Sequence, residues 1–182
     1  MIRFLLALLL LPLAAAAAAK PAPFASDRLS VEVTGSGPDV VLIPGLSSSP
    51  QVWQGAVAAV PGYRYHLVHV AGFASKPPGA NGSGPVVEPV AEEIARYIRQ
   101  RKLKKPAIVG HSLGGAWAIM IAGRHPELVS KVMVVDMLPV LGAMFGGPTA
   151  TPESVRPIAE QIRTGIAGSA GEARRKQIEQ TI

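Results

Sequence analysis

The residues around Ser112 limit what this chain can fold into more than any other stretch does. A short apolar run, Ala107-Ile108-Val109, leads into Gly110-His111-Ser112-Leu113-Gly114, and a helix-forming run from Ala116 to Ala122 follows. Strand, tight turn and helix in this order form the setting in which a serine becomes an exposed nucleophile. We expect Gly110 and Gly114 to let the backbone turn sharply, so that Ser112 projects above a sheet. The alternative is a tight strand-to-helix turn that carries an ordinary serine.

Apolar segments on both sides of this stretch alternate between strand-like and helix-like spacing. We expect strands over residues 29–33, 40–43, 65–70, 107–109 and 131–136, and helices over 50–60, 86–104, 113–123 and from 152 onward, the last of them broken by residues 165–171. The first strand alternates in polarity, as at a sheet edge, whereas the later ones are continuous apolar runs typical of strands buried on both faces. The order predicts an α/β chain with a mostly parallel sheet in three αβα layers.

The N-terminal residues 1–19 have the pattern of a secretory signal peptide. Arg3 is followed by an apolar run to Leu13 and by alanines up to Ala19, which matches a positive start, an apolar core and small residues before the cleavage site. A membrane anchor is the alternative, but Pro12 and the weakly apolar alanines argue against a permanent span. We therefore expect a secreted or periplasmic protein with no stable membrane span after cleavage, and a linker over residues 20–27 before the core.

The formal net charge of +6 is concentrated at the end of the helix expected over residues 86–104. Basic side chains at that end complement the helix dipole. Nucleic acid is not an expected partner, because no aromatic residues for base stacking and no binding motif accompany the basic cluster. The chain has no cysteine, and we find no metal-ligand cluster or nucleotide loop. We therefore expect neither a metal nor another cofactor.

Two motifs give the chain a resemblance to the α/β-hydrolase superfamily, in its lipase/esterase-like branch. Residues 110–115 resemble the nucleophile elbow, and Ile43-Pro44-Gly45-Leu46, with Trp53 shortly after, resembles the oxyanion loop. The resemblance implies that Ser112 attacks an ester-like carbonyl while the backbone N–H groups of Leu46 and Leu113 hold the oxyanion. A plain turn at the end of a strand is the alternative for Gly45 and Leu46.

The chain departs from the family pattern after the elbow. In that pattern an acid and then a histidine follow the serine, but His66 and His69 precede the elbow and His111 adjoins the nucleophile. His125 lies at the far end of the next helix, roughly 15 Å away. Asp136, at the end of a strand, is a candidate acid, although an aspartate that merely caps a loop is the alternative.

We therefore expect a chain truncated before its catalytic histidine. The α/β-hydrolase core would occupy residues 28–136, and residues 137–182 would be the helical, incomplete start of a lid. The strand over 131–136 would then be an exposed apolar edge, which favours aggregation, so we expect poor solubility or partial disorder after residue 137.

Two functional hypotheses follow from these features. The first is a serine hydrolase of carboxylic-ester type that acts on a small-molecule acyl substrate through Ser112, with little activity from this chain alone. The second is a non-catalytic binding module, or a relic, that has kept the fold. The identity of the substrate and the oligomeric state stay open.

Overall fold

The computed structural model describes residues 23–137, 142, 146–168 and 172 of the chain. The signal peptide expected over residues 1–19 and much of the expected lid lie outside these residues. Residues 23–27, in the expected linker, form neither helix nor strand. None of the described helices combines the length and the apolar character needed to cross a membrane.

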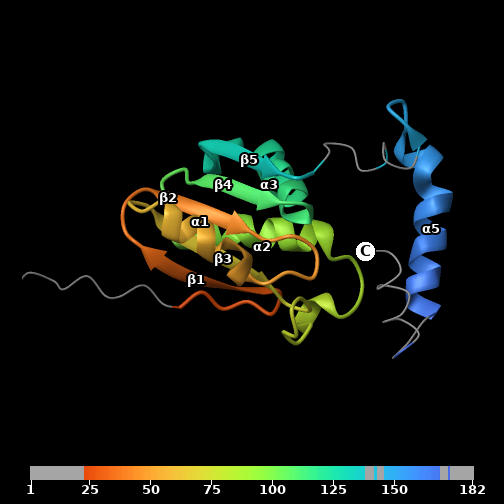
Figure 1. Cartoon of the computed structure of the whole chain (residues 1–182), viewed down its shortest axis with the longest axis horizontal. Coiled ribbons are helices and arrows are strands. Elements are labelled where there is room, and N and C mark those ends of the chain that lie inside the picture. Colours follow the sequence, from red (N-terminus) through yellow and green to blue (C-terminus); the bar gives the residue numbers. More distant parts are fainter. Residues whose placement is uncertain (1–22, 138–141, 143–145, 169–171, 173–182) are drawn as a thin grey trace, which may run out of the picture.

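A five-stranded sheet forms the centre of the molecule (Figure 1). Its strands are β1 (Leu29–Gly35), β2 (Asp39–Ile43), β3 (Arg64–Val70), β4 (Ala107–His111) and β5 (Lys131–Val135). They lie in the order β1-β3-β2-β4-β5; β1 runs antiparallel to β3, and every other pair is parallel. The mostly parallel sheet and the edge position of the first strand are as the sequence pattern predicts.

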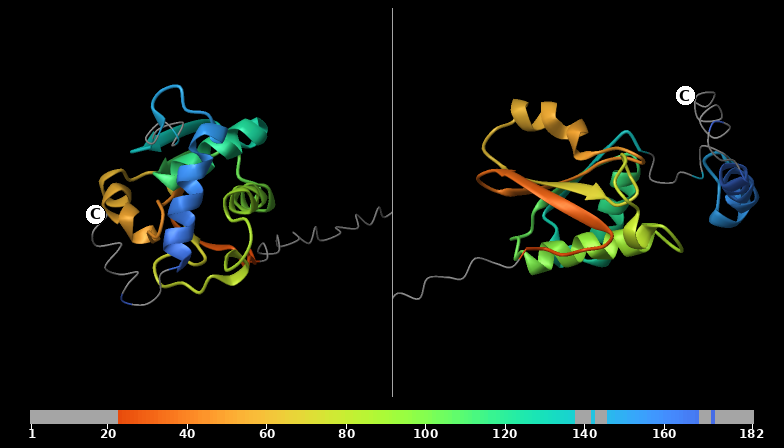
Figure 2. Two further views of the ribbon diagram at one scale, coloured as in Figure 1. Left: turned by 90° about the vertical axis from the view of Figure 1, so that its right-hand side faces the viewer. Right: turned by 90° about the horizontal axis from the view of Figure 1, so that it is seen from below.

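Helices cover both faces of the sheet, which confirms the three layers (Figure 2). One face carries the short 3-10 helix η1 (Pro50–Trp53) and α1 (Gln54–Ala59), and the other carries α2 (Val87–Gln100) and α3 (Leu113–Arg124). Two further 3-10 turns, η2 (Gly79–Asn81) and η3 (Pro126–Leu128), lie in the connections. The helix predicted over 86–104 ends early, because Lys102 and Lys105 adopt positive φ angles of 51° and 48°, which a helix cannot contain.

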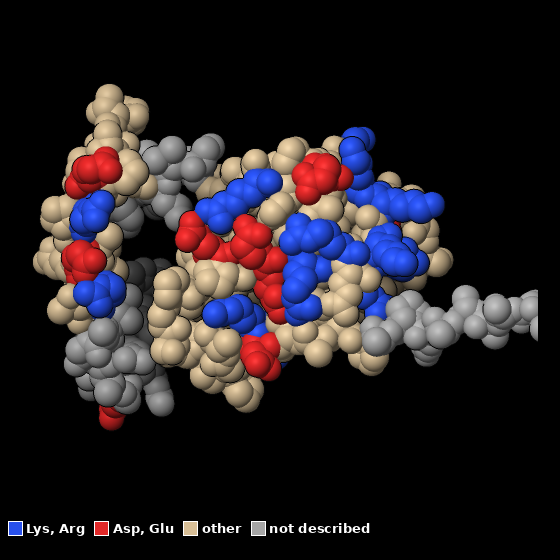
Figure 3. Space-filling view, turned by 180° about the vertical axis from the view of Figure 1, so that it is seen from behind, with Lys and Arg blue, Asp and Glu red and all other residues tan. Residues whose placement is uncertain are grey.

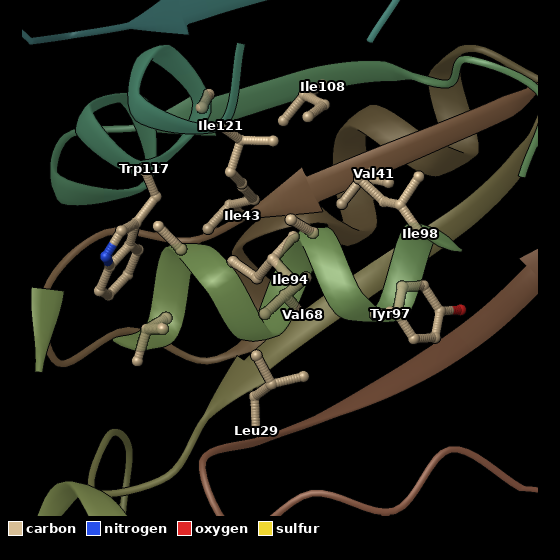
Figure 4. Close-up of a cluster of buried hydrophobic side chains, with 14 of the residues drawn as sticks. Leu29, Val41, Ile43, Val68, Ile94, Tyr97, Ile98, Ile108, Trp117 and Ile121 are labelled. Carbon is tan, nitrogen blue, oxygen red and sulfur yellow. The ribbon is translucent and has the colours of Figure 1, made fainter. Parts of the chain in front are cut away.

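The main core lies between the sheet and the helices α2 and α3 (Figure 4). Alternate strand residues point to this side, since side chains on a strand alternate between its two faces. The cluster includes Val41, Ile43, Val68, Val70 and Ile108 from the strands and Ile94, Ile98, Trp117 and Ile121 from the helices. A smaller cluster on the opposite face joins Trp53 to Val40, Leu42, Tyr65 and Leu67. Both clusters anchor β2 and its neighbours, so the ends of these strands are firmly placed.

The second face of the sheet is only partly covered. Within the helix predicted over 50–60, Trp53 is buried, but Val52 and Val60 are about half exposed. On β5, Met133 is 61% exposed, so the expectation of a buried strand there is wrong. Its partner in the described part of the chain is β4, and an apolar hollow of about 680 Å³ separates α1 from β5. Within the described residues, β5 is thus the exposed apolar edge that we expect of a chain truncated before its catalytic histidine.

The last described helix, α5 (Pro152–Gly168), stands apart from the sheet (Figure 1). It lies on the side toward which the carboxyl ends of the parallel strands point. Thr151 and Ser154 cap its start reciprocally, with each hydroxyl accepting a hydrogen bond from the other's backbone N–H at 3.3 Å and 3.0 Å. The helix continues through Gly165, so the predicted break begins later than expected.

Charges of both signs are interspersed on the outer surface of α2 and α3 (Figure 3). Arg124 pairs with Glu88 at 2.5 Å across the two helices, and Arg96 pairs with Glu93 at 2.6 Å along α2. Exposed pairs of this kind contribute little to stability. Their main consequence is that this helical face does not present a surface of a single sign.

A buried chain of polar groups links β2, β3 and α2. His66 is 3% exposed; its Nδ1 lies 2.6 Å from the hydroxyl of Tyr97, and its Nε2 lies 2.9 Å from Asp39 Oδ1. Because a carboxylate can only accept hydrogen bonds, we assign the ring proton to Nε2 and the donor role at Nδ1 to Tyr97. Burial lowers the pKa of His66 and raises the pKa of Tyr97 to about 12.

This arrangement predicts that stability falls as the pH drops below neutrality. Unfolded His66 takes up a proton near pH 6.5, whereas the folded state resists the proton down to its lower pKa. We expect the free energy of unfolding to fall by about 1 kcal/mol between pH 7.5 and 5.5. His66→Gln should lower the stability at pH 7.5 and flatten this pH dependence in urea titrations. An equal fall in the variant would contradict the assignment.

Candidate active site

The turn between β4 and α3 holds Ser112 in a rare backbone conformation. Its φ of 51° and ψ of −121° lie outside the regions that non-glycine residues favour. The Ser112 N–H donates to the carbonyl of Val135 at 2.9 Å, and the Gly115 N–H donates to the Ser112 carbonyl at 2.8 Å. Such strain persists only where surrounding contacts impose it, and it is concentrated at functional sites. The structure therefore contains the sharp turn predicted between strand and helix, and Ser112 is strained within it.

The two elbow glycines are needed for a different reason from the one predicted. Neither Gly110 nor Gly114 has a positive φ; the unusual conformation belongs to Ser112 itself. A Cβ on Gly110 would lie 2.1 Å from the carbonyl oxygen of Gly114, and one on Gly114 would lie 2.2 Å from that of Ile43. The glycines thus let α3 approach β4 and β2 at backbone contact, which packs the elbow tightly.

The loop after β2 lies directly against the elbow. Gly45 is buried, and a Cβ built on it would lie 3.2 Å from the Cβ of Ser112. In residues 23–137, no backbone carbonyl accepts a hydrogen bond from the N–H of Leu46 or of Leu113. Leu113 opens α3, where N–H groups have no partner within the helix. Two unpaired amides in segments that meet at a serine are suited to hold a negatively charged oxygen.

Three of the four histidines are engaged away from this turn. His66 belongs to the buried chain with Tyr97 and Asp39. His69 Nε2 lies 3.2 Å from the carbonyl oxygen of Phe73. His125 Nε2 lies 2.8 Å from Glu92 Oε2, at the far end of α3 and about 18 Å along it from the elbow. In the described part of the chain, none of the three forms a hydrogen bond with Ser112.

His111 and Asp136 come together beside the nucleophile, and the sequence alone did not indicate this pairing. His111 Nε2 lies 3.9 Å from Asp136 Oδ2, and the side chain of Asp136 is 91% exposed. The two residues end or follow the neighbouring parallel strands β4 and β5, where His111 is in register with Val135. The sequence predicts that both residues lie at the carboxyl ends of strands, which could have pointed to the pairing. That β4 and β5 are neighbours is known only from the strand order. Asp136 thus lies at the expected edge and faces His111 there.

Two of the larger hollows lie away from Ser112. The hollow between α1 and β5 is lined by apolar side chains such as Trp53 and Met133. Another, of about 570 Å³, lies at the amino ends of the parallel strands and is lined by Asp39, Arg64 and several lysines. Among the described residues, no three His, Cys, Asp or Glu side chains gather as a metal site.

Comparison with known proteins gives a consistent picture. A family model described as the alpha/beta hydrolase fold matches residues 38–180. A pimeloyl-[acyl-carrier protein] methyl ester esterase from Aeromonas hydrophila is 35% identical over 127 residues, which cover 69% of this chain and 48% of that protein. A putative carbamate hydrolase, RutD, from Serratia proteamaculans is 31% identical over 109 residues, which cover 59% of this chain and 40% of that protein.

The fold is also found among solved structures. A marine microorganism esterase aligns with a TM-score of 0.59 and 25% identity over 85% of this chain and 57% of that structure. The chain therefore spans about half the length of the relatives that it matches, between 40% and 57% in these three comparisons.

Proposed function

Because the chain belongs to the alpha/beta hydrolase fold family, we propose that it carries the nucleophile half of a serine ester-hydrolase site. Ser112 is the nucleophile, and the N–H groups of Leu46 and Leu113 are the oxyanion donors. The observation that carries the proposal is the strained backbone of Ser112, at φ 51°, beside two amides with no backbone carbonyl partner in residues 23–137. An ordinary serine in a strand-to-helix turn has no need of that conformation.

The proposed chemistry is acyl transfer through the Ser112 hydroxyl. The Ser112 Oγ forms a bond to the carbonyl carbon of the substrate, and the electron pair of the carbonyl moves onto its oxygen. The N–H groups of Leu46 and Leu113 hold that oxyanion until it collapses and expels the alcohol. Water then releases the acid from the acyl-enzyme. His66, His69 and His125 each have another hydrogen-bond partner, so we propose that water takes the proton of Ser112 and that water also protonates the leaving alcohol. Proton transfer to water is slow, so the reaction is slow as well.

The relatives support an ester-type substrate. They include a methyl ester esterase and a putative carbamate hydrolase, and esters and carbamates both have a carbonyl that bears a heteroatom leaving group. We propose a small-molecule substrate of this class for the present chain. We propose Asp136 as an acid of the site, because its carboxylate faces His111 at 3.9 Å.

Hydrolysis of a p-nitrophenyl ester tests this proposal. We expect slow release of p-nitrophenol that disappears in Ser112→Ala, because removing the base of a triad lowers the rate by several orders of magnitude and leaves a residue of catalysis. Ser49→Ala, in the loop before η1, is the matched control and should behave like the wild type. Release of p-nitrophenol by Ser112→Ala at the wild-type rate would contradict the role of Ser112. Rapid turnover by the wild type would contradict the inference that Ser112 has no histidine base.

A non-catalytic binding module is the second candidate. The engagement of His66, His69 and His125 elsewhere favours it. The amides of Leu46 and Leu113 beside Ser112 favour the first candidate, because they are suited to hold a negatively charged oxygen that forms in a reaction.

We also propose that the protein is exported through residues 1–19. Fractionation of cells that express the full chain should find it outside the cytoplasm, and deletion of residues 2–19 should retain it inside. Equal distribution of the two forms would contradict export.

A further inference from the structure

We propose that His111 is a positioning residue whose imidazole holds the oxyanion loop, residues 44–47, against the nucleophile elbow. The proposal rests on the proposed function only for the role of that loop, which is to hold the oxyanion. The contact between His111 and Gly45, on which the proposal also depends, is present whether or not the loop has that role. His111 lies at the end of β4, between the loop after β2 on one side and Asp136 after β5 on the other.

The first contact is with Gly45. A Cβ built on Gly45 would lie 2.8 Å from His111 Nδ1 and 3.3 Å from its Cε1. Gly45 does not have a positive φ, so its backbone conformation does not require glycine. The imidazole, together with the Cβ of Ser112 at 3.2 Å, occupies the space that a side chain would need. Glycine at this position is therefore explained by the close approach of the ring.

The second contact is with Asp136. His111 Nε2 lies 3.9 Å from Asp136 Oδ2 on the side of β5. Asp136 has a φ of 51°, and the preceding residue, Val135, accepts the hydrogen bond from the Ser112 N–H at 2.9 Å. The ring is thus placed between the ends of three adjacent strands, with β4 in the middle of the order β2-β4-β5. One side chain can thereby set the relative positions of the oxyanion loop and the elbow.

The first part of the oxyanion loop is buried against Gly114, whereas its second part, Leu46 and Ser47, is exposed. Leu46 is 65% exposed, and Ser47 has a φ of 58°. The Ser48 N–H donates to the Gly45 carbonyl at 3.2 Å, and the Ser48 hydroxyl donates to the Leu46 carbonyl at 3.4 Å. An oxyanion donor is effective only when its N–H lies at the correct distance from the developing charge. Gly45 immediately precedes Leu46, so the close approach of His111 to Gly45 helps to set where the Leu46 N–H points, together with the packing of Gly114 against Pro44.

A double-mutant cycle tests the contact directly. Gly45→Ala should lower the urea midpoint of the wild type because the new methyl group meets the ring. In His111→Ala, which removes the ring, the same substitution should lower the midpoint by about half as much or less, since contacting residues are not additive. Gly55→Ala is the matched control, because no atom lies within 4 Å of a Cβ built on Gly55. Its effect should be equal in both backgrounds. Additive effects of Gly45→Ala and His111→Ala would overturn the proposal.

Two further measurements separate positioning from simple packing. We expect the rate at which a fluorophosphonate modifies Ser112 to fall about tenfold or more in His111→Ala, as for a misplaced oxyanion donor. His111→Phe, which retains a ring against Gly45, should recover most of that rate. A cycle that shows coupling together with an unchanged modification rate in His111→Ala would overturn the positioning role.

If the fluorophosphonate does not modify Ser112 in the wild type, the proposed function fails. Amide hydrogen exchange then tests whether His111 positions the loop. Exchange of the Leu46 amide should be faster in His111→Ala and near the wild-type rate in His111→Phe. Unchanged exchange in His111→Ala would overturn it.

Discussion

Replacement of Gly114 by alanine is expected to lower the free energy of unfolding by more than about 3 kcal/mol. The added Cβ would lie 2.2 Å from the carbonyl oxygen of Ile43 and 2.7 Å from that of Pro44. Both atoms belong to the backbone where β2 ends, and β2 is buried from Val40 to Ile43, so neither can move aside alone. Urea unfolding monitored by circular dichroism measures the loss.

Gly123→Ala in the same helix is the matched control. No atom lies within 4 Å of a Cβ built on Gly123, and alanine in place of glycine in a helix stabilises by about 0.5–1 kcal/mol. The two substitutions should therefore change stability in opposite directions. Similar effects would contradict the close backbone approach at Gly114. The same approach brings the oxyanion loop to the elbow, so Gly114→Ala should also slow any reaction at Ser112.

Trp117→Ala is expected to cost about 3–5 kcal/mol of stability, because Trp117 is fully buried between α2, α3 and the sheet. Its indole Nε1 donates to the Val87 carbonyl at 2.8 Å, and its ring lies 6.2 Å from that of Phe73. The tryptophan therefore joins the start of α2 to α3, the helix that follows Ser112.

Trp117→Phe separates the two contributions of this side chain. It keeps most of the apolar contact and removes the hydrogen bond to Val87, so we expect a loss of about 1–2 kcal/mol in the same urea titration. A loss as large as that of Trp117→Ala would assign the stabilisation to the hydrogen bond. A negligible loss in Trp117→Ala would contradict the burial.

The local patterns predict the sheet well because each reflects a local physical requirement. The apolar run at 40–43 becomes the buried strand β2, and the Gly-x-Ser-x-Gly pentapeptide joins β4 to α3. The same reasoning fails for β5, because an apolar run does not reveal whether its second face is covered. It also fails at the end of α2, where Leu103 has helical spacing but Lys102 adopts a left-handed conformation without any glycine to signal it.

The candidate site likewise has features that local sequence motifs predict and contacts that they do not predict. The positions of Ser112, Leu46 and Leu113 at element ends were predictable, because each belongs to a short motif there. Their chemical roles stay predictions. The contacts of His111 with Gly45 and Asp136 were not predictable, because they depend on β4 lying between β2 and β5. That order is a property of the whole sheet. The close approach that makes Gly114 necessary is likewise a contact between distant segments, with Ile43.

Reaction of the 182-residue chain with a fluorophosphonate probe, followed by peptide mass spectrometry, tests whether Ser112 is the nucleophile. We expect one adduct, on Ser112, because its hydroxyl lies beside the amides that would hold the phosphonyl oxygen. Ser47, Ser48 and Ser49, in the adjacent loop, provide internal controls that should stay unmodified, and Ser112→Ala should abolish the adduct. No adduct on Ser112, or equal modification of the loop serines, would contradict the assignment of Ser112 as the nucleophile.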